Sequence, residues 1–467
     1  MLKSKLFLGL CSMFLMLGLV SCMSYYQQND ALMQAVYNEN YSKALSLMDE
    51  KSKMATVKRN RLLYYLNKGS VYTLNNQPDS SLIYFRKADY FIEDFSKNST
   101  EYIETMVTNK SYSTYEGEDF EKVLLHYYAA MNYLQLNNLD EALIEAKRML
   151  LKMQKNTDKY QSKNKYKRDA FAHHLLGIIY DAQGAYNDAF IAYRNALEVY
   201  TTDYQQFFST EVPLQLKHDI LRTAYLSGFK EEFDKYQEDF KLQVQPQKYA
   251  SQKQVLVFWN NGLCPVKDQS SINFLIVPQQ NGAYQIVNAE LGISIPYYTS
   301  DKKTNADLLD MRFIRIVIPK YVSRKLKYTS ASITANNNAQ FQFQLAENID
   351  AIAFKSLSDR MLKELGESLL RTFLKQLAVY QAEKNKKDGL AFAVSLYGAL
   401  SEQADTRNWQ LLPSQIQYVR VPIDSSTKQL TFKAQTVEGN TNSMQINIRG
   451  DEKFKFIQTI DFNGFKP

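Results

Sequence analysis

The spacing of apolar residues changes midway along the chain. Between about residues 29 and 245, apolar side chains recur every three to four positions, as on one face of an amphipathic helix. From about residue 250 the spacing falls towards two, and apolar and polar side chains alternate cleanly over 340–345. We therefore predict an α+β protein of several domains, with helices over 31–245 and a β-rich domain over 250–467.

The second half contains nine short segments with the pattern of strands. A helical stripe over 349–383 and a shorter helix over 390–400 interrupt them, so an inserted helical segment of about 349–403 is expected. Nine strands with turn signals between them favour a sandwich-like domain. The predicted strands are 254–259, 272–277, 312–318, 330–334, 340–345, 416–421, 429–434, 444–448 and 454–460.

The helical half contains an internal repeat. Gly177 is followed by Tyr180, Ala189, Tyr193 and Ala196, at offsets of 3, 12, 16 and 19 residues. This spacing resembles the tetratricopeptide repeat (TPR), which implies two antiparallel helices that cross closely where the small residues lie. The same frame recurs at Gly69, Tyr72, Ser81, Phe85 and Ala88, at Ala130, Tyr133, Ala142, Ala146 and Met149, and more weakly at Leu32, Ala35, Ala44 and Met48.

The resemblance to TPR arrays implies a groove lined by the first helix of each repeat. Its side chains are mainly apolar or aromatic, which suits a peptide or helix from a partner protein. The candidate groove residues are Leu63, Leu66, Ser70, Tyr127, Met131, Leu134, His174, Ile178 and Asp181.

The chain begins like a secretory signal. Lys3 and Lys5 precede a stretch, 6–20, without charge. Fifteen helical residues span about 22 Å, which is short of the ~30 Å hydrocarbon core of a bilayer. The stretch is therefore expected to be the core of a signal peptide and not a membrane-spanning helix.

That signal ends in Leu19-Val20-Ser21-Cys22, which resembles the lipobox of bacterial lipoproteins. The resemblance implies a signal peptide over 1–21, acyl chains such as palmitate on Cys22, and a tether over 22–30. An ordinary secretory signal that contains a cysteine is the alternative. By resemblance to enterobacterial sorting, Met23 favours the outer membrane, with the protein facing the periplasm.

Two further blocks extend the resemblance along the chain. Residues 115–134 and 404–413 are similar to segments of a family of bacterial envelope lipoproteins with TPR-like repeats that has no established activity. The resemblance implies a lipid-anchored envelope protein, and it implies no reaction.

Composition excludes several classes of protein. With 467 residues, 45% apolar and 22% charged, the chain is globular and long enough for two or three domains. A net charge of +7 from 56 basic and 49 acidic residues does not indicate a nucleic-acid partner. Cys11 leaves with the signal and Cys22 takes the lipid, so Cys264 has no disulfide partner and is expected to be a buried, small apolar residue.

The sequence shows no catalytic or metal-binding motif. GxxxxGK[ST], GxSxG, HExxH, CxxC and EF-hand patterns are all missing from it. The four histidines lie on predicted helices, and the adjacent His173 and His174 would point about 100° apart, which does not suit a shared metal. We therefore expect that the protein is not an enzyme, and that it binds no metal and no cofactor apart from the covalent lipid on Cys22.

Two polar clusters allow two interpretations each. Asp405, Arg407 and Trp409 form either a ligand platform or, as we favour, a buried ion pair with the indole over the start of a strand. A basic run either contacts anionic headgroups or peptidoglycan or, as we favour, is a solvated loop between repeats. The run comprises Lys152, Lys155, Lys159, Lys163, Lys165, Lys167 and Arg168.

These observations favour a lipid-anchored scaffold that binds another envelope protein or peptide through the groove. A peptidoglycan- or other glycan-binding module on the β-rich domain is the alternative, and exposed aromatic side chains on a sheet would favour it. An enzyme is a third hypothesis, which a pocket with two or more carboxylates would favour, because irregular sites carry no motif.

Overall fold

A computed structural model describes most of the chain from residue 25 onwards. Cys22, the basic residues Lys163 and Lys165, and the expected helix 390–400 lie outside the described residues. Within the described ranges, no helix combines the length and the apolar content needed to cross a bilayer. The described residues are 25, 29–50, 58–97, 113–160, 166–245, 247, 253–290, 292–335, 339–384, 404–424, 426–448 and 453–459.

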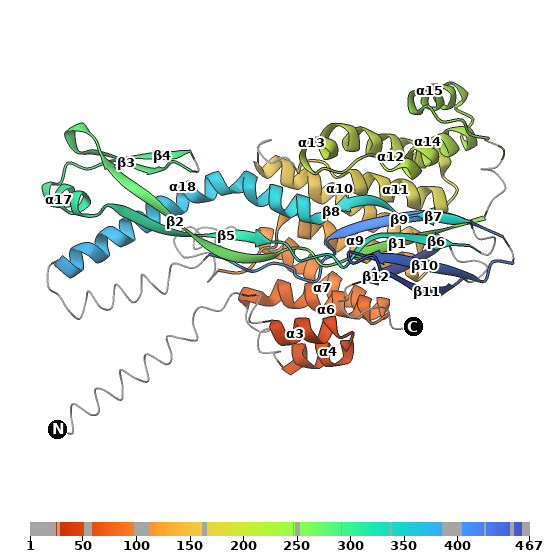
Figure 1. Ribbon diagram of the computed structural model, residues 1–467, viewed down its shortest axis with the longest axis horizontal. Helices are drawn as coiled ribbons and strands as arrows, with labels where there is room; N and C mark the ends of the chain where they lie inside the picture. Colours follow the sequence, from red (N-terminus) through yellow and green to blue (C-terminus); the bar gives the residue numbers. More distant parts are fainter. Residues whose placement is uncertain are drawn as a thin grey trace.

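The first half is a stack of helical hairpins, seen at the lower centre and right of Figure 1. Residues with positive φ at the turns let each first helix end and the chain reverse, and glycine and asparagine tolerate this conformation best. Asn76, Asn137 and Gly184 occupy equivalent turn positions with φ of 55°, 57° and 80°. The hairpins are α3 (Asp30–Tyr37) with α4 (Tyr41–Glu50), α6 (Arg61–Leu74) with α7 (Pro78–Lys97), α9 (Asp119–Gln135) with α10 (Leu139–Tyr160), α11 (Ala170–Ala182) with α12 (Tyr186–Val199), and α14 (Leu214–Leu226) with α15 (Lys230–Phe240).

Small residues let the two helices of each hairpin approach closely, as the repeat spacing predicts. A Cβ atom added to Gly69 would lie 2.8 Å from the ring of Phe85, and one added to Gly177 would overlap the ring of Tyr193. Both aromatic residues follow their glycine by sixteen positions, and at the same offset in α9 and α10 two alanines are fully buried. The fold of this half is TPR-like.

Replacing Gly177 with leucine is expected to lower the free energy of unfolding by about 1–3 kcal/mol, because the new side chain would have to displace the ring of Tyr193. Urea denaturation followed by circular dichroism measures the change. Asn187→Leu is the matched control: it adds the same side chain at an exposed position of α12, where about ±0.5 kcal/mol is expected. Equal losses for both variants would argue against the close crossing of α11 and α12.

The second half is β-rich, and its described strands form three four-stranded sheets. The orders are β12-β1-β9-β8, β11-β10-β6-β7 and β4-β3-β2-β5. All pairs are antiparallel except β1 with β12, which is parallel. The strands are β1 (Lys253–Asn261), β2 (Val266–Pro278), β3 (Ala283–Asn288), β4 (Ile293–Tyr298), β5 (Phe313–Val322), β6 (Tyr328–Thr334), β7 (Gln340–Gln342), β8 (Gln344–Asn348), β9 (Gln415–Ile423), β10 (Gln429–Thr436), β11 (Thr441–Asn447) and β12 (Phe454–Thr459).

Each predicted strand is observed, with one difference. The segment 340–345 forms two strands, because β7 pairs with β6 in one sheet whereas β8 pairs with β9 in another. The sequence did not predict β3, β4 or the helix α17 (Lys302–Asp310).

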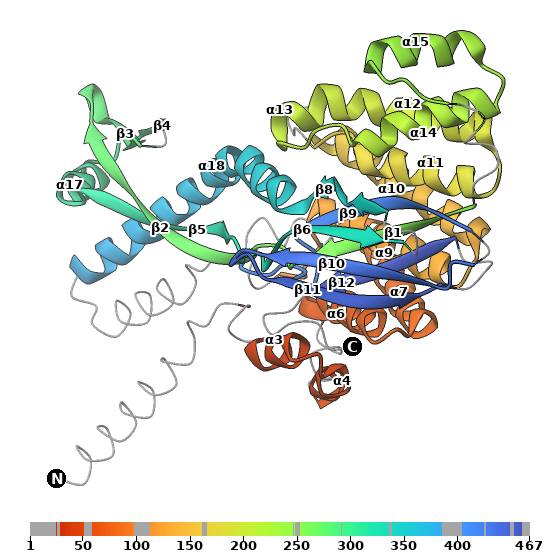
Figure 2. The ribbon, with the colours of Figure 1, turned by 45° about the vertical axis from the view of Figure 1, so that its right-hand side comes forward.

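Two of the sheets pack as a sandwich, and the helical array covers one of them. Alternate residues of β1 point to opposite sides: Val257 and Trp259 lie in the sandwich core, whereas Leu256 and Phe258 lie in a core shared with the helices. Both faces of β1 are therefore buried, which explains its continuous apolar run. The helices, the β12-β1-β9-β8 sheet and the β11-β10-β6-β7 sheet form three layers (Figure 2).

The third sheet and the long helix α18 (Ile349–Lys384) form an arm, at the left of Figures 1 and 2. Ile352 and Leu357, near the start of α18, belong to the core shared with the helical array. Farther along, Phe373 and Leu377 pack with β2, β3, β5 and α17 in a separate core. The predicted helical stripe of α18 thus joins the arm to the body of the molecule.

Candidate functional site

The nine candidate groove residues are all buried, and the chain itself covers them. They lie on α6, α9 and α11, as expected. The core that contains most of them also includes side chains of β1, β9, β12 and the segment 404–414. The expectation of a groove open to a partner is therefore wrong, because the β-rich half fills it.

The floor of the groove is joined to the second half by aromatic contacts and hydrogen bonds. The hydroxyl of Tyr127 donates to Oδ1 of Asn260 on β1, at 2.8 Å. The ring of His174 stands edge-on against Tyr418 of β9, with centroids 4.8 Å apart. Burial lowers the pKa of His174 to about 3, so its imidazole is neutral and serves as a packed aromatic ring.

The last groove residue, Asp181, belongs to a buried charge cluster. Its carboxylate pairs with Arg222 of α14 and with Arg420 of β9, whose Nη2 lies 3.0 Å from Oδ2. Arg420 also reaches Asp219, at 2.9 Å from Nε to Oδ1. A basic side chain of the sandwich therefore neutralises two carboxylates of the helical array.

Trp409 fills the centre of the groove. Its side chain is fully buried, and its Nε1–H donates to Oγ of Ser70, at 2.9 Å. The ring packs against Tyr128 and Phe85, with centroids 5.4 and 5.8 Å away. The expectation that this indole covers the start of a strand is wrong, because it inserts between helices of the repeat array.

Arg407 forms the ion pair that the sequence suggested. Its Nε and Nη2 donate to the two carboxylate oxygens of Asp405, at 2.7 and 2.8 Å. Nη1 donates to the backbone carbonyls of Arg59 and Ser113, at 3.0 and 2.9 Å. The guanidinium is nearly fully buried and joins the segment 404–414 to the loops before α6 and α9. The structure favours the structural interpretation of this cluster over a ligand platform.

Two buried glutamates at the start of α9 join three parts of the molecule. Glu121 accepts hydrogen bonds from the backbone N–H of Trp409 and the hydroxyl of Tyr115, both at 2.7 Å. Glu118 pairs with Lys267 of β2 and with Arg360 of α18, the two elements at the root of the arm. The first helix of the central hairpin is thus bound to both the arm and the segment 404–414.

The two glutamates have opposite pKa shifts. Burial would raise the pKa of Glu118, but the charges of Arg360 and Lys267 hold it well below its usual range. Burial and the neighbouring charge of Glu118 raise the pKa of Glu121 to about 7. Both shifts arise from burial and neighbouring charges in the interface between α9, the arm and the segment 404–414.

The remaining sequence candidates have structural partners. Cys264 is buried, as expected, and burial raises the pKa of its thiol to about 12. Nδ1 of the buried His126 lies 2.6 Å from Oε2 of Glu145. In the basic run, Lys152 pairs with Glu93 at 2.6 Å and Arg168 with Asp203 at 2.9 Å, so these two are not part of a free basic patch. No cluster of potential metal ligands occurs among the described residues.

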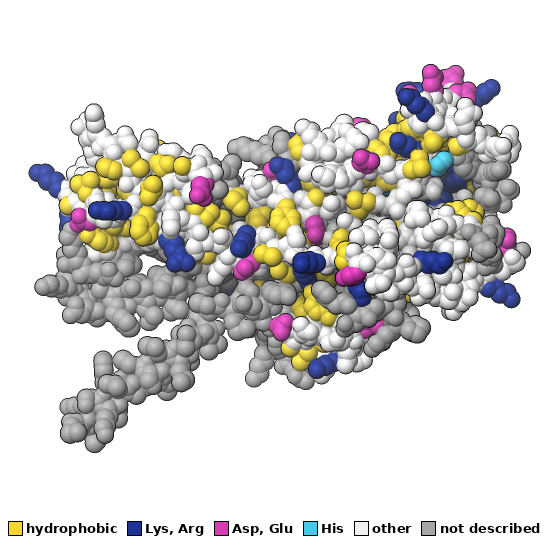
Figure 3. All heavy atoms as spheres, in the orientation of Figure 1, with side chains coloured by type: hydrophobic (Ala, Val, Ile, Leu, Met, Phe, Trp, Pro, Cys, Tyr) yellow, Lys and Arg dark blue, Asp and Glu magenta, His cyan; other side chains and the backbone are white. Residues whose placement is uncertain are grey.

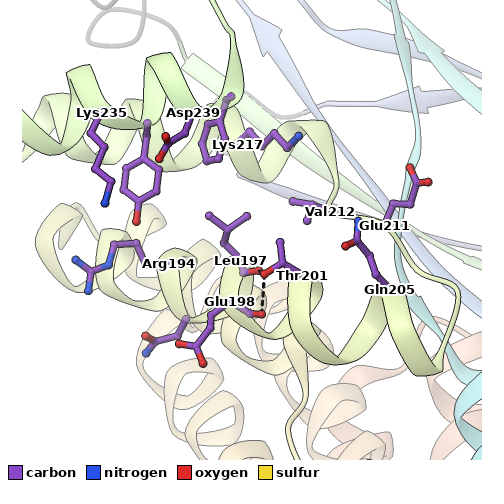
Figure 4. A pocket seen from close by; sticks show the side chains of 13 residues that line it. Arg194, Leu197, Glu198, Thr201, Gln205, Glu211, Val212, Lys217, Lys235 and Asp239 are labelled. Carbon is purple, nitrogen blue, oxygen red and sulfur yellow. Dashed lines mark hydrogen bonds between the residues drawn. The ribbon is translucent and has the colours of Figure 1, made fainter.

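An open cleft remains at the C-terminal end of the helical array (Figure 4). It lies between α12, the short helices η3 (Tyr200–Tyr204) and α13 (Gln205–Phe207), and the final hairpin α14–α15. Its volume is about 710 Å³, within the range of small-ligand and peptide sites. The lining residues are Arg194, Asn195, Leu197, Glu198, Thr201, Gln205, Glu211, Val212, Lys217, Lys235, Tyr236, Asp239 and Phe240.

The cleft combines aromatic rings with charges of both signs. Tyr236 and Phe240 stack with centroids 5.3 Å apart, and Nζ of Lys217 lies 5.6 Å from the centroid of Phe240. Within the described part of the chain, no carboxylate forms an ion pair with Lys217, Lys235 or Arg194. These three cations are therefore available to a carboxylate of a ligand.

The sequence analysis missed this cleft, although α15 carries a signal for it. Of the eleven residues of α15, only Phe233 is buried, so this helix uses little of its surface to pack on α14. Tyr236 and Phe240 follow Phe233 at helical spacing and remain partly exposed. Tyr236 packs against Phe190 of α12, with centroids 6.1 Å apart, and the part of its ring that stays exposed could have indicated a binding surface.

Comparison with known proteins gives only distant likenesses. No protein-family model matches the chain, and no curated protein matches its sequence. The solved structures similar to its helical half include MamA, with a TM-score of 0.29, 14% identity, and coverage of 47% of this chain and 96% of MamA. They also include the TPR-like repeats of a kinesin light chain from Podosopora anserina, with a TM-score of 0.31, 13% identity, and coverage of 46% of this chain and 92% of that one. A third is aspartyl phosphate phosphatase F from Bacillus subtilis, with a TM-score of 0.32, 14% identity, and coverage of 48% of this chain and 50% of that one. At such TM-scores these likenesses carry no argument about function, and the TPR-like fold is argued from the helical hairpins and their interlocking residues.

Proposed function

We propose that the protein is a lipid-anchored bacterial envelope scaffold that binds another envelope protein or peptide. The binding surface is the cleft between α12, α14 and α15, and not the concave groove. One observation carries this proposal: the groove is filled by the chain's own β-rich half, whereas the cleft is open and lined by aromatic rings and by cations that form no ion pair within the described residues.

The chemistry of the cleft suits a polypeptide segment. Leu197, Val212 and the pair Tyr236 and Phe240 offer apolar contacts. Charges of both signs at the rim can bind backbone groups and side chains of a partner. Hot spots of protein interfaces are commonly aromatic residues surrounded by such polar groups.

A photocrosslinker at Thr201, which lines the cleft, tests the proposal in cells that produce the full chain. We expect a defined crosslinked partner, and we expect Tyr236→Ala to weaken its binding by about thirtyfold, as for the loss of a hot-spot aromatic side chain. Tyr90→Ala is the matched control, because Tyr90 is exposed on α7, away from the cleft. Equal partner capture by both variants would refute the cleft as the binding surface.

The anchor is proposed from the lipobox-like sequence before Cys22. Replacing Cys22 with alanine is expected to leave an unlipidated precursor or a soluble periplasmic form. Detergent partitioning and mass spectrometry measure this outcome. An unmodified Cys22 in the mature protein would contradict the anchor, and recovery in inner-membrane fractions would contradict placement in the outer membrane.

The sandwich gives the glycan-binding alternative no support, because the exposed aromatic side chains Tyr298 and Phe313 lie on the sheet of the arm instead. The outer face of the β11-β10-β6-β7 sheet carries polar side chains, such as Lys433 and Gln435 on β10 and Ser443 and Gln445 on β11. Its described, outward-facing residues include no aromatic side chain on which a sugar could stack.

We also propose that the protein is not an enzyme. Glu198, Glu211 and Asp239 line the cleft, but Figure 4 shows them on different walls and pointing away from one another. Glu198 forms an ion pair with Arg168, at 2.5 Å. The described lining residues show no hydrogen-bonded pair of nucleophile and base.

A further inference from the structure

The outer face of the arm exposes several large apolar side chains near its distal end. On β2, Phe274 and Ile276 point into the arm's core under α18, so the alternating residues Leu275 and Val277 point outwards. The side chain of Leu275 is 59% exposed, and that of Phe313, its partner on β5, is 57% exposed. The outer face of an antiparallel sheet usually carries polar residues, so an apolar outer face needs an explanation.

Further exposed apolar residues lie near these at the distal end of the arm, around the polar Gln285. By strand register, Val277 neighbours Gln285 of β3, which is paired with Pro296 of β4. Tyr298, two residues farther along β4, is 67% exposed. Figure 3 shows hydrophobic side chains gathered on the arm, at the left of the molecule. We call Leu275, Val277, Pro296, Tyr298 and Phe313 the arm patch.

The N-terminal tether is held close to the root of the arm. Tyr25 is only 6% exposed, and its backbone N–H donates to Oγ1 of Thr406, at 3.0 Å. Its backbone carbonyl accepts a hydrogen bond from Asn29, at 2.9 Å. Cys22 is three residues before Tyr25, and three extended residues span about 10 Å at most. A lipid on Cys22 would therefore hold this part of the protein against the bilayer.

The segment that holds the tether also contacts the outer face of β2. Gln269 of β2 precedes Leu275 by six residues, so the two side chains share the outer face. The side chain of Gln269 accepts a hydrogen bond from the backbone N–H of Ala404, at 3.3 Å, and Ala404 is two residues from Thr406. At about 3.3 Å per residue, the patch begins roughly 20 Å farther along this face.

We propose that the arm patch inserts into the lipid bilayer that holds the acyl chains of Cys22. This inference rests on the proposed anchor, and it adds a second point of membrane contact. The acyl chains fix the root of the arm, and the patch places its distal end on the same bilayer, so the arm lies along the membrane. The patch suits lipid because its five side chains are all apolar or aromatic, with the amphipathic Tyr298 suited to the interface.

The chain offers a clean fluorescent test. Its two tryptophans, Trp259 and Trp409, are fully buried, so a Phe313→Trp variant carries one exposed indole. The mature-length chain with Cys22→Ala and an N-terminal hexahistidine tag is held on phosphatidylethanolamine–phosphatidylglycerol vesicles that contain a nickel-chelating lipid. On these vesicles we expect the tryptophan emission of Phe313→Trp to shift to the blue. We also expect brominated lipids to quench it several times more strongly than they quench the emission of Ile83→Trp. Ile83 is the matched control, because it is similarly exposed but lies on α7.

A second measurement uses vesicles without the nickel lipid. The double variant Leu275→Thr and Phe313→Thr, which keeps good strand-forming residues, is expected to bind at least about tenfold more weakly than the unsubstituted chain. Circular dichroism and urea denaturation establish that both proteins are folded.

Several outcomes would overturn the proposal. The first is that brominated lipids quench Phe313→Trp no more strongly than they quench Ile83→Trp. An indole that is blue-shifted and protected from iodide before vesicles are added would show that another part of the chain covers the patch. If that shift depends on protein concentration, a second copy of the chain covers it. Protection by isolated peptidoglycan and not by vesicles would replace lipid with glycan. The nickel tether works without acylation, so failure of the anchor at Cys22 is detected separately, by the mass of the native protein.

Discussion

Trp409→Ala is expected to lower the free energy of unfolding by about 3–5 kcal/mol, the usual range for truncating a buried large aromatic residue. The indole lies between α6, α7 and α9 and belongs to a segment of the other half of the chain, so its loss leaves a cavity in the shared core. Urea denaturation followed by circular dichroism measures the effect. Because both halves share this core, we expect the unsubstituted protein to unfold in one transition.

Two further variants separate packing from hydrogen bonding. Ser70→Ala removes the acceptor of the indole N–H and is expected to lower stability by about 1 kcal/mol. Trp409→Phe keeps an aromatic ring in the groove, so its loss in free energy of unfolding should lie between the losses of Ser70→Ala and Trp409→Ala. A loss below about 1 kcal/mol for Trp409→Ala would show that the segment 404–414 does not hold the two halves together.

Glu118→Gln is expected to lower the free energy of unfolding by about 3–5 kcal/mol. The substitution removes the carboxylate charge that pairs with both Lys267 and Arg360, and Lys267 is almost fully buried. Urea denaturation at pH 7 measures the loss. Glu198→Gln is the matched control, because Glu198 pairs with Arg168 at the surface, where about 0–1 kcal/mol is expected.

The same pair of variants has a pH signature. The pKa of Glu118 is lower in the folded protein than in the unfolded chain, so its stabilising contribution is fully present above about pH 4. The contribution is lost as the pH falls through the folded-state pKa, so the difference between the unsubstituted protein and Glu118→Gln should shrink in acid. A difference that does not change with pH would show that Glu118 does not act through its charge.

The sequence predicted the helical half well because its signals are local. The two helices of a hairpin meet through residues sixteen positions apart, such as Gly177 and Tyr193, and the turn follows seven residues after the glycine. Alternation likewise predicted the strands of the sandwich. The fold class, a TPR-like array followed by a β-rich region with a helical insertion, is confirmed.

The filled groove could not be predicted from such local patterns. Trp409 and Ser70 are 339 residues apart, and an apolar helix face looks the same whether its partner is another protein or the same chain. The Asp405–Arg407 pair was predictable because its residues are two positions apart, but its backbone acceptors before α6 and α9 were not.

The arm was missed for a different reason. Residues 283–288 alternate in burial as a strand should, but Pro296 interrupts the neighbouring run and weakens its strand signal. Pro296 lies on β4, the edge strand of its sheet, where a missing N–H is tolerated. Short edge strands that contain proline are easily mistaken for loops.

The parallel pairing of β1 with β12 has a consequence for the order in which the chain acquires its structure. Trp259 donates its indole N–H to Thr459, 200 residues later, so the sheet that lines the helices is completed only by the last described strand. A nascent chain, which is synthesised from its N-terminus, can form the helical hairpins early, because their contacts are local. Their apolar concave faces stay exposed to water until the β-rich half is synthesised. During that interval the nascent chain presents a long hydrophobic surface to its surroundings. Premature termination before β12 should therefore yield an aggregation-prone product that depends on holding chaperones, and not a smaller functional protein.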